Sequence, residues 1–325
     1  MHVFDLHCDT IARLYAGEHL DSLSGGHVSL DKLRRGGTLC QCFAVFVPWN
    51  PQGPQRPWMP DTPEAYFEGA CAAWQRELER SAASLAPART AAEVLENQAA
   101  GKVGGMLTVE DCVALNGHIE RLDDWHQKGV RMAALTWNYE NSLGWPNSPD
   151  PAAHGRGLKP FGMEAVARMN ELGIAVDVSH LSEGGFWDVA RHSRKPFAAS
   201  HSCARALCDV PRNLTDAQLR AIGDAGGVVG VNYYARFLRP EAVGKGETTE
   251  IDDVLRHLRH MANVAGVEAL ALGSDYDGMD SRLAWGDAGG QQALAEALER
   301  VFTPAQAEQI CWKNALRFFR DVIGA

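Results

Sequence analysis

Eight short apolar segments rich in β-forming residues recur along the chain, and helical patterns separate most of them. The strand-like segments are Val3–Leu6, Thr38–Phe46, Val103–Val109, Met132–Thr136, Ile174–Val178, Pro196–Ala199, Gly227–Asn232 and Leu270–Gly273. The helical patterns span residues 63–86, 119–128, 160–172, 183–191, 215–225 and 251–265, with a further stretch over 303–322. Strands that alternate with helices are typical of a parallel sheet.

Two parallel architectures fit this alternation. Eight strands with intervening helices close most economically into a (β/α)8 barrel of the TIM type, and 325 residues can form one such barrel as a single domain, residues 1–325. The alternative is an open doubly wound sheet, whose nucleotide-binding members carry a glycine-rich turn after the first strand. The corresponding residues here are His7-Cys8-Asp9-Thr10, which include no glycine and do not resemble such a turn. We therefore expect the barrel, with the C-terminal helical stretch packed outside it.

Composition narrows the class of protein and its partners. Hydrophobic residues make up 46% of the chain and charged residues 22%, as in a globular protein with a large core. The formal charge of −10, without a dense basic block, argues against a nucleic-acid partner. Because we find neither a charged leader before Val3 nor an apolar run near the ~20 residues of a membrane span, we expect a cytoplasmic protein without a membrane partner. The eight cysteines lack a CxxC pair and are expected to be reduced.

Polar side chains that can bind a metal follow five of the eight strand segments. They are His7, Asp9, Glu110, His180, His201 and Asp275. Because the carboxyl ends of barrel strands lie on one face, we expect these side chains to meet there. His7 and Asp9 are two positions apart, which places them on the same side of an extended strand, with Cys8 on the other side. Taken singly, each residue would more often be a helix cap, a turn residue or a core group, so the prediction depends on the joint pattern.

The residue types also indicate which ion would bind. Three histidines with acidic oxygens and no thiolate pair suit zinc or a similar divalent metal. A carboxylate can bridge two ions, and two ions account for six such side chains better than one. Without metal, the cluster would crowd charge at the barrel mouth, at a cost of several kcal/mol unless the charges are paired. We therefore predict two zinc ions per chain.

The segments that carry these residues resemble the renal, or membrane, dipeptidase family, peptidase family M19. They are Asp5-Leu6-His7-Cys8-Asp9, Val109-Glu110, Asp177-Val178-Ser179-His180-Leu181-Ser182, Ser200-His201-Ser202 and Gly273-Ser274-Asp275-Tyr276-Asp277-Gly278. They occur in the family's order, and the similarity extends to nearly the whole chain. The resemblance implies zinc-dependent hydrolysis of dipeptides, including those with a D-residue at the C-terminal position. Members of this family are often homodimers.

The resemblance also implies a role for each residue at a matching position. His7 and Asp9 would hold one zinc ion, Glu110 would bridge, and His180 with His201 would hold the second ion. Asp275 would contact the hydroxide between the metals and shuttle its proton. Arg212, in Pro211-Arg212-Asn213, matches the family's arginine that grips the free carboxylate of a dipeptide. Considered without the family, Arg212 could equally be a surface residue in a loop.

One position departs from the family pattern and affects the substrate prediction. Where the family often has Leu-Thr-His-Asn, this chain has Leu135-Thr136-Trp137-Asn138. The family histidine helps to stabilise the tetrahedral intermediate, whereas Trp137 offers only an indole N–H or simply packs. Two alternatives to dipeptide hydrolysis therefore stay open. One is a related amidohydrolase acting on another small amide, ester or lactone, and the other is a metal-binding homologue with weakened turnover.

Two segments without a regular pattern follow predicted strands and would lie at the same face of the barrel. They span residues 48–63 and 145–157. Loops at this face line the active sites of barrel enzymes, so both are candidate rim or lid loops, although they could equally be ordinary surface loops. Tyr234, after the seventh strand segment, is a candidate wall of the substrate pocket.

Overall fold

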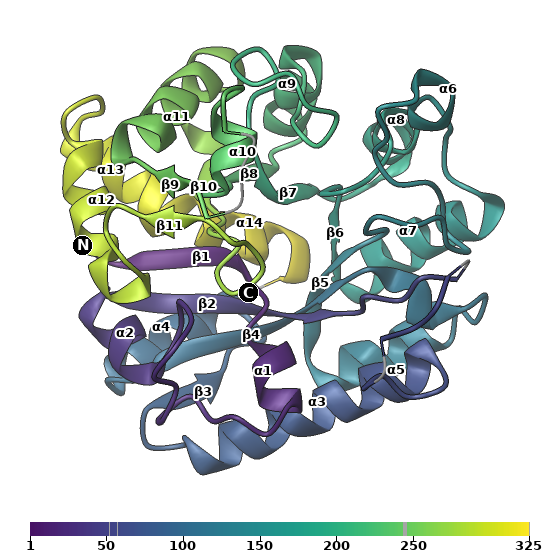
Figure 1. Cartoon of the computed structure of the whole chain (residues 1–325), viewed down its shortest axis with the longest axis horizontal. Coiled ribbons are helices and arrows are strands. Elements are labelled where there is room, and N and C mark those ends of the chain that lie inside the picture. The colour runs from purple at the N-terminus through teal and green to yellow at the C-terminus, as the bar shows by residue number, and fades with distance from the viewer. Residues whose placement is uncertain (52, 57, 243–245, 325) are drawn as a thin grey trace.

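The eight predicted strands form a closed parallel barrel (Figure 1). The computed structural model describes residues 1–51, 53–56, 58–242 and 246–324. The barrel strands are β1 (Val3–Cys8), β2 (Thr38–Phe46), β4 (Val103–Glu110), β5 (Val130–Ala134), β6 (Ala175–Asp177), β7 (Ala198–Ser202), β8 (Val228–Val231) and β10 (Leu270–Leu272). They pair in the order β2-β1-β10-β8-β7-β6-β5-β4, and β4 also pairs with β2 to close the ring. The predicted (β/α)8 barrel is therefore confirmed, and the open sheet is wrong.

Helices follow the strands and surround the barrel. They are α1 (Ile11–Tyr15), α2 (Leu30–Arg35), α3 (Pro63–Arg80), α4 (Ala91–Ala99), α5 (Arg121–Lys128), α6 (Pro151–His154), α7 (Pro160–Leu172), α8 (Glu183–His192), α9 (Asp216–Asp224), α10 (Ala235–Leu238), α11 (Ile251–Ala265), α12 (Gln291–Leu298), α13 (Pro304–Glu308) and α14 (Asn314–Ile323). A π-helical turn over Gln309–Lys313 joins the last two. Three further strands are short: β3 (Leu85–Pro87) pairs with the start of β4, and β9 (Thr248–Thr249) pairs with β11 (Arg282–Leu283).

The helix predicted over residues 63–86 is wrong beyond Arg80. Helix α3 begins after Thr62, whose side chain accepts a hydrogen bond from Ala65 N at 3.1 Å. After Arg80, Ser81 Oγ donates to Glu77 Oε1 at 2.7 Å and the chain turns. A proline disfavours helix at the residue before it, here Ala86, and Leu85–Pro87 forms β3 instead.

Two apolar clusters divide the core between the inside and the outside of the barrel. The outer cluster lies between strands and helices. The inner cluster draws on Phe4, Leu6, Met106, Met132, Ala175, Ala198, Val228 and Ala271 from the strands and on Phe318, Phe319 and Val322 from α14. Phe319 stacks on Phe4 with ring centroids 5.5 Å apart. Inner and outer strand faces are therefore both apolar, as expected for a parallel barrel.

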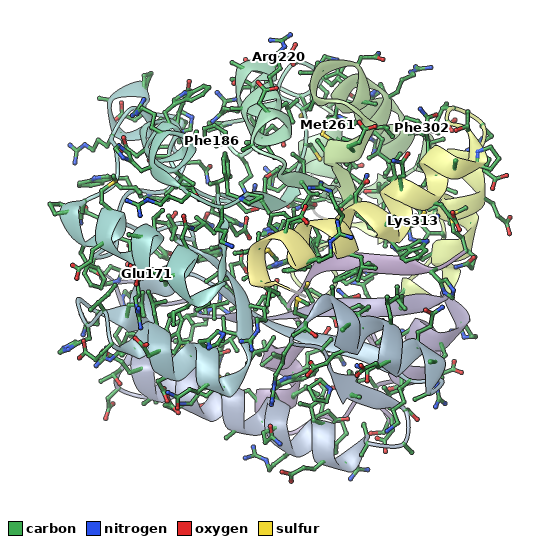
Figure 2. All side chains as sticks on the ribbon, turned by 180° about the vertical axis from the view of Figure 1, so that it is seen from behind. Glu171, Phe186, Arg220, Met261, Phe302 and Lys313 are labelled. Carbon is green, nitrogen blue, oxygen red and sulfur yellow. The ribbon has the colours of Figure 1, made fainter. Side chains whose placement is uncertain are left out.

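The C-terminal helix α14 closes the amino end of the barrel. Arg317 of α14 donates to the carbonyl oxygens of Gly226 and Glu268, which lie just before β8 and β10. Figure 2 shows this yellow segment crossing the middle of the molecule when it is viewed from behind. The predicted helix is confirmed, but it covers one end of the barrel rather than only its flank. The opposite end, where the strands terminate, stays available for a site.

Two predictions from composition can be compared with the structure. All eight cysteines are free and buried, which confirms the expectation of reduced thiols. Cys8 belongs to the outer apolar cluster, on the side predicted for it. Within the part of the chain that the structure describes, no helix combines the length and the hydropathy that a bilayer crossing requires.

Candidate metal centre at the carboxyl end of the barrel

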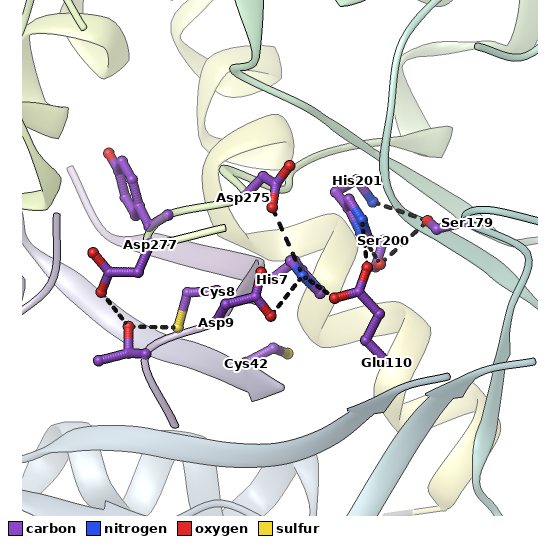
Figure 3. Close-up of polar contacts among 12 residues, drawn as sticks. His7, Cys8, Asp9, Cys42, Glu110, Ser179, Ser200, His201, Asp275 and Asp277 are labelled. Carbon is purple, nitrogen blue, oxygen red and sulfur yellow. Dashed lines mark hydrogen bonds and ion pairs between the residues drawn. The ribbon is translucent and has the colours of Figure 1, made fainter. Parts of the chain in front are cut away.

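The six side chains singled out in the sequence meet at the carboxyl end of the barrel. Figure 3 shows five of them pointing toward one another, namely His7, Asp9, Glu110, His201 and Asp275. Their potential ligand atoms fall into three overlapping groups within 4.8 Å: His7, Asp9 and Glu110; Glu110, His180 and His201; and His7, His201 and Asp275. The first two groups share only Glu110. Two neighbouring positions with one common carboxylate are therefore present in the geometry.

Glu110 lies at the centre of the cluster, at the last residue of β4. Its Oε2 is 3.5 Å from His7 Nε2, and its Oε1 is 2.9 Å from His180 Nε2 and 3.5 Å from His201 Nε2. The two oxygens of one carboxylate thus face different histidines. This is the arrangement that a bridging ligand between two cations requires.

Irregularities in the strands turn two of the histidines into the barrel. In β1, Asp5 pairs with Gln41 and Cys8 with Phe43, so β1 has one more residue than β2 over this stretch. The extra residue breaks the alternation of strand faces and lets His7 face the cluster although Leu6 also belongs to the inner core. A similar shift lies between Ala199 and Ser202 of β7, around His201.

Two buried atoms in this cluster have no hydrogen-bond partner among the residues that the structure describes. They are His7 Nε2 and Asp9 Oδ1, which lie 3.6 Å apart. Buried polar atoms are normally paired, because an unpaired one costs the desolvation of that group. A cation between the imidazole nitrogen and the carboxylate oxygen would satisfy both atoms. The donor set of histidine nitrogens and carboxylate oxygens fits zinc or a similar divalent ion.

His180 and His201 direct their Nε2 atoms to one place, 3.1 Å apart. His180 Nδ1 lies 3.2 Å from Asn138 Oδ1, and His201 Nδ1 lies 2.7 Å from Ser200 Oγ, which in turn donates to Asp177. An Nδ1–H that donates to these oxygens leaves the Nε2 lone pair for a cation. Such outer partners fix the tautomer and the ring orientation of metal-binding histidines.

The backbone at His180 is held in a left-handed conformation, with φ at 66°. Both the backbone N and the side-chain Nδ2 of Asn147 donate to His180 O, at 2.7 and 3.1 Å. A conformation of this kind costs of order 1–3 kcal/mol outside glycine and persists only where its surroundings enforce it. Asn147 lies in the predicted rim segment 145–157, so this segment supports the cluster from outside.

Asp275 shares the left-handed backbone, with φ at 63°. Its Oδ1 is 4.0 Å from His7 Nε2, and its Oδ2 accepts a hydrogen bond from Asn232 Nδ2 at 3.0 Å. Its backbone N donates to His7 O at 3.2 Å. One carboxylate oxygen is thus anchored, and the other faces the cluster and the cavity above it.

Burial and mutual repulsion shift the titration of the cluster. Burial, together with the neighbouring charge of Asp9, raises the pKa of Glu110 to about 8. Burial raises the pKa of Asp275 to about 6. The pKa of His180 and that of His201 lie well below the ordinary histidine value, because burial disfavours the imidazolium form. Burial acts the same way on His7, but the carboxylates of Asp9 and Glu110 raise its pKa well above the ordinary value.

A cavity of about 380 Å³ lies over the cluster. Trp137 and Tyr234, predicted to contact substrate, both line it, and so do Arg56 of the predicted rim segment 48–63 and Phe237. Trp137 packs edge-on against Phe46, with ring centroids 4.8 Å apart. This size is in the range of small-molecule sites.

Arg212 is placed differently from Trp137 and Tyr234, because it is not among the residues that line this cavity. It is buried, and its guanidinium donates to Ser202 Oγ at 2.7 Å and to His201 O at 2.8 Å. Its Nε is buried and has no acceptor within the described part of the chain. The guanidinium also lies 5.6 Å from the ring of Phe237, which does line the cavity. Arg212 is thus a buried cation beside the cluster rather than a surface residue.

Four supporting residues were not identified in the sequence. They are Asn138, Asp177, Ser200 and Asn232, which orient the histidines and Asp275. The sequence does indicate a special role for Asp177, because a charged residue inside an apolar strand needs a specific partner. The other three are small polar residues at strand ends, where turn and cap residues are equally common.

Comparison with known proteins shows the family to which this chain belongs. The family model described as membrane dipeptidase, peptidase family M19, matches residues 1–324. A Rhodobacter sphaeroides metallo peptidase, solved with a phosphinate mimic of the dipeptide L-Ala-D-Ala, is 30% identical, covers 99% of both chains and has a TM-score of 0.90. The dipeptidase AC, a metallo peptidase of family M19, is 31% identical over 100% of this chain and 99% of its own, with a TM-score of 0.91.

A curated relative from Klebsiella pneumoniae, an uncharacterised protein in the pqqA 5′ region, is 37% identical over 221 residues, which are 66% of this chain and 80% of that protein. The sequence resemblance is thus confirmed by a family model and by solved structures. The chain belongs to the membrane dipeptidase family, peptidase family M19.

Proposed function

We propose that this protein hydrolyses dipeptides with the help of two zinc ions. The observation that carries the proposal is the position of Glu110, whose two carboxylate oxygens face two separate sets of ligand-capable side chains. His7 and Asp9 would hold one ion together with Glu110, and His180 and His201 would hold the other. When bound, such ions polarise a carbonyl and lower the pKa of water toward ~7.

Asp275 is the proposed proton shuttle. Its Oδ2 is fixed by Asn232, while its Oδ1 faces the cluster beneath the cavity. A carboxylate with one oxygen held in place and the other directed at the cluster can accept a proton from attacking water and return it to the leaving amine.

Arg212 is the proposed partner of the substrate's terminal carboxylate. It is a buried cation, and its Nε carries a donor without an acceptor. A carboxylate is the group that a guanidinium binds most specifically, which favours short substrates with a free C-terminus. The relative solved with a mimic of L-Ala-D-Ala supports the same class, including a D-residue at the second position.

The experiment that tests this function is a dipeptide screen with zinc supplied. We expect turnover of several dipeptides, no turnover of the same sequences with an amidated C-terminus, and loss of activity after chelation. Recovery of activity on adding zinc back controls for unfolding during chelation. Turnover that survives chelation, or a complete lack of dipeptide cleavage by zinc-loaded protein, contradicts the proposal.

A second candidate function follows from Trp137, which lines the cavity where the family often has histidine. Its indole cannot carry the positive charge of an imidazolium, so stabilisation of a tetrahedral intermediate would be weaker. The alternative is hydrolysis of another small amide, ester or lactone at the same centre. A panel of N-acyl amino acids, esters and lactones beside the dipeptides distinguishes the two, because only the alternative predicts faster turnover of the non-peptides.

A further inference from the structure

A second hollow, of about 370 Å³, adjoins the cavity over the metal-ligand cluster. Its walls are Ala12, Tyr15, Ala16, Phe46, Pro48, Arg56, Trp58 and Tyr66. Ala12, Phe46 and Arg56 line both spaces. The two spaces therefore adjoin along these three residues.

Half of the residues that line this hollow are aromatic. Tyr66 lies 4.8 Å from Tyr15 and 5.9 Å from Trp58, measured between ring centroids. Among the walls that the structure describes, Arg56 is the one charged residue, and its guanidinium lies 5.7 Å from the Trp58 ring. Trp58 is 50% exposed, more than any other large hydrophobic side chain in the described part of the chain. An exposed aromatic ring beside an apolar hollow is a surface that a bound apolar group would cover.

The order of strands gives the orientation of a bound dipeptide. In the ring, β2 lies four positions from β7 and is thus directly opposite it. Phe46, at the end of β2, borders the hollow, whereas Arg212 follows β7 and donates to His201 O. A dipeptide whose carboxylate faces Arg212 and whose amide lies over the cluster therefore points its N-terminal residue toward β2.

We propose that the hollow between α1, α3 and the end of β2 binds an aromatic side chain on the N-terminal residue of the substrate. This inference rests on the proposed dipeptidase function and names the class of dipeptide. Aromatic side chains suit the site because they bury a large apolar area and pack edge-on or offset against other rings.

The first test is a comparison of substrates with the zinc-loaded enzyme. We expect kcat/KM for Phe-D-Ala to exceed that for Ala-D-Ala by tenfold or more. The reversed peptide, Ala-D-Phe, is expected to show no such gain, because its ring would face the Arg212 side. Glu-D-Ala tests whether Arg56 selects an acidic side chain instead, and a preference for it over Phe-D-Ala overturns the proposal.

The second test changes the walls of the hollow. Trp58→Ala removes an aromatic wall, and Ala16→Trp adds bulk at its edge. Both are expected to reduce the ratio of kcat/KM for Phe-D-Ala over Ala-D-Ala by at least fivefold. Ala100→Trp is the matched control for the second variant, since Ala16 and Ala100 are both exposed alanines that end short helices with similar backbone angles. The control is expected to keep the wild-type ratio.

The outcomes separate this inference from the function on which it rests. Equal kcat/KM for Phe-D-Ala and Ala-D-Ala, or a ratio that neither wall variant changes, overturns the subsite and leaves the dipeptidase function intact. Failure to cleave every dipeptide in the set overturns the dipeptidase function, and the subsite is then wrong as well.

Discussion

The two ends of the barrel are formed by the same strands but differ in character, because one end is apolar and packed and the other is polar and charged. At the amino end, Phe4 and the aromatic rings of α14 fill the interior. At the carboxyl end, buried carboxylates and imidazoles crowd together, and the backbone at His180 and Asp275 is left-handed. The difference shows where stability and function are separated in this fold, because a well-packed end can maintain a strained and charged one.

The largest effect is expected from a substitution at the carboxyl end of the barrel. Asp275→Asn is expected to lower kcat for dipeptides by about 10³-fold, because the amide cannot accept the proton that the carboxylate takes. The fold should tolerate this change, since asparagine adopts the left-handed backbone conformation readily. Steady-state kinetics and metal analysis of the same preparation check it. A loss of less than tenfold in a variant that keeps its zinc would show that Asp275 is not the shuttle.

The matching change at the amino end is Phe318→Ala. Phe318 is fully buried in the inner cluster, with its ring centroid 5.2 Å from that of Phe319. The free energy of unfolding is expected to fall by about 3–5 kcal/mol, as for other buried phenylalanines. Because the cluster of ligands is at the other end, kcat/KM of the folded enzyme should stay within about twofold. Urea unfolding measures the change in stability, and kinetics at low temperature measure kcat/KM of the folded variant. A large loss of activity in the folded variant would contradict the separation of stability from function between the two ends.

A third prediction concerns the pH dependence of stability that is due to the fold itself and not to the release of metal at low pH. His257 of α11 is buried, with Nδ1 accepting from Ala204 N at 3.1 Å and Nε2 donating to Leu238 O at 3.0 Å. Burial lowers its pKa to about 4, from 6.5 in the unfolded chain. The unfolded state therefore binds the proton first, and the contribution of His257 to the free energy of unfolding should fall by about 3 kcal/mol between pH 6.5 and 4.

The measurement for His257 is urea unfolding of chelated protein at several pH values, which removes the contribution of metal binding. His257→Gln should flatten the slope of stability against pH in this window. An identical slope in the variant would mean that the acid sensitivity arises elsewhere.

The smallest expected effect concerns the wall of the cavity. Trp137→His introduces an imidazole at the position where the family often has one, and it should raise kcat/KM for dipeptides about tenfold by supplying a hydrogen-bond donor to the developing oxyanion. Phe46, which packs against Trp137, is expected to retain its place. A fall in activity on every dipeptide would instead identify Trp137 as a part of the substrate-binding wall in this protein.

The barrel and the cluster could be predicted because their signals are local. Each of the eight strands is a short apolar run, and the residue at or just after the end of a barrel strand faces the common rim. The joint appearance of His7, Glu110, His201 and Asp275 after such runs was thus sufficient to predict where they meet.

Other features depend on contacts that sequence patterns do not carry. The bulge that turns His7 inward depends on the pairing of β1 with β2, and the left-handed backbone of His180 depends on hydrogen bonds from Asn147. Helix α14 at the amino end was predicted as a helix, but its position depends on packing against Phe4. The burial of Arg212 also could not be derived from its loop sequence.

The central claim is that two cations bind where Glu110 faces both histidine groups, and zinc titration of chelated protein tests it most directly. Dipeptidase activity and metal content would be measured at each step. We predict no turnover without metal and a rise that levels off at two zinc ions per chain, while Glu110→Gln binds fewer and stays inactive. Turnover by metal-free protein, or full activity of Glu110→Gln, would contradict the account.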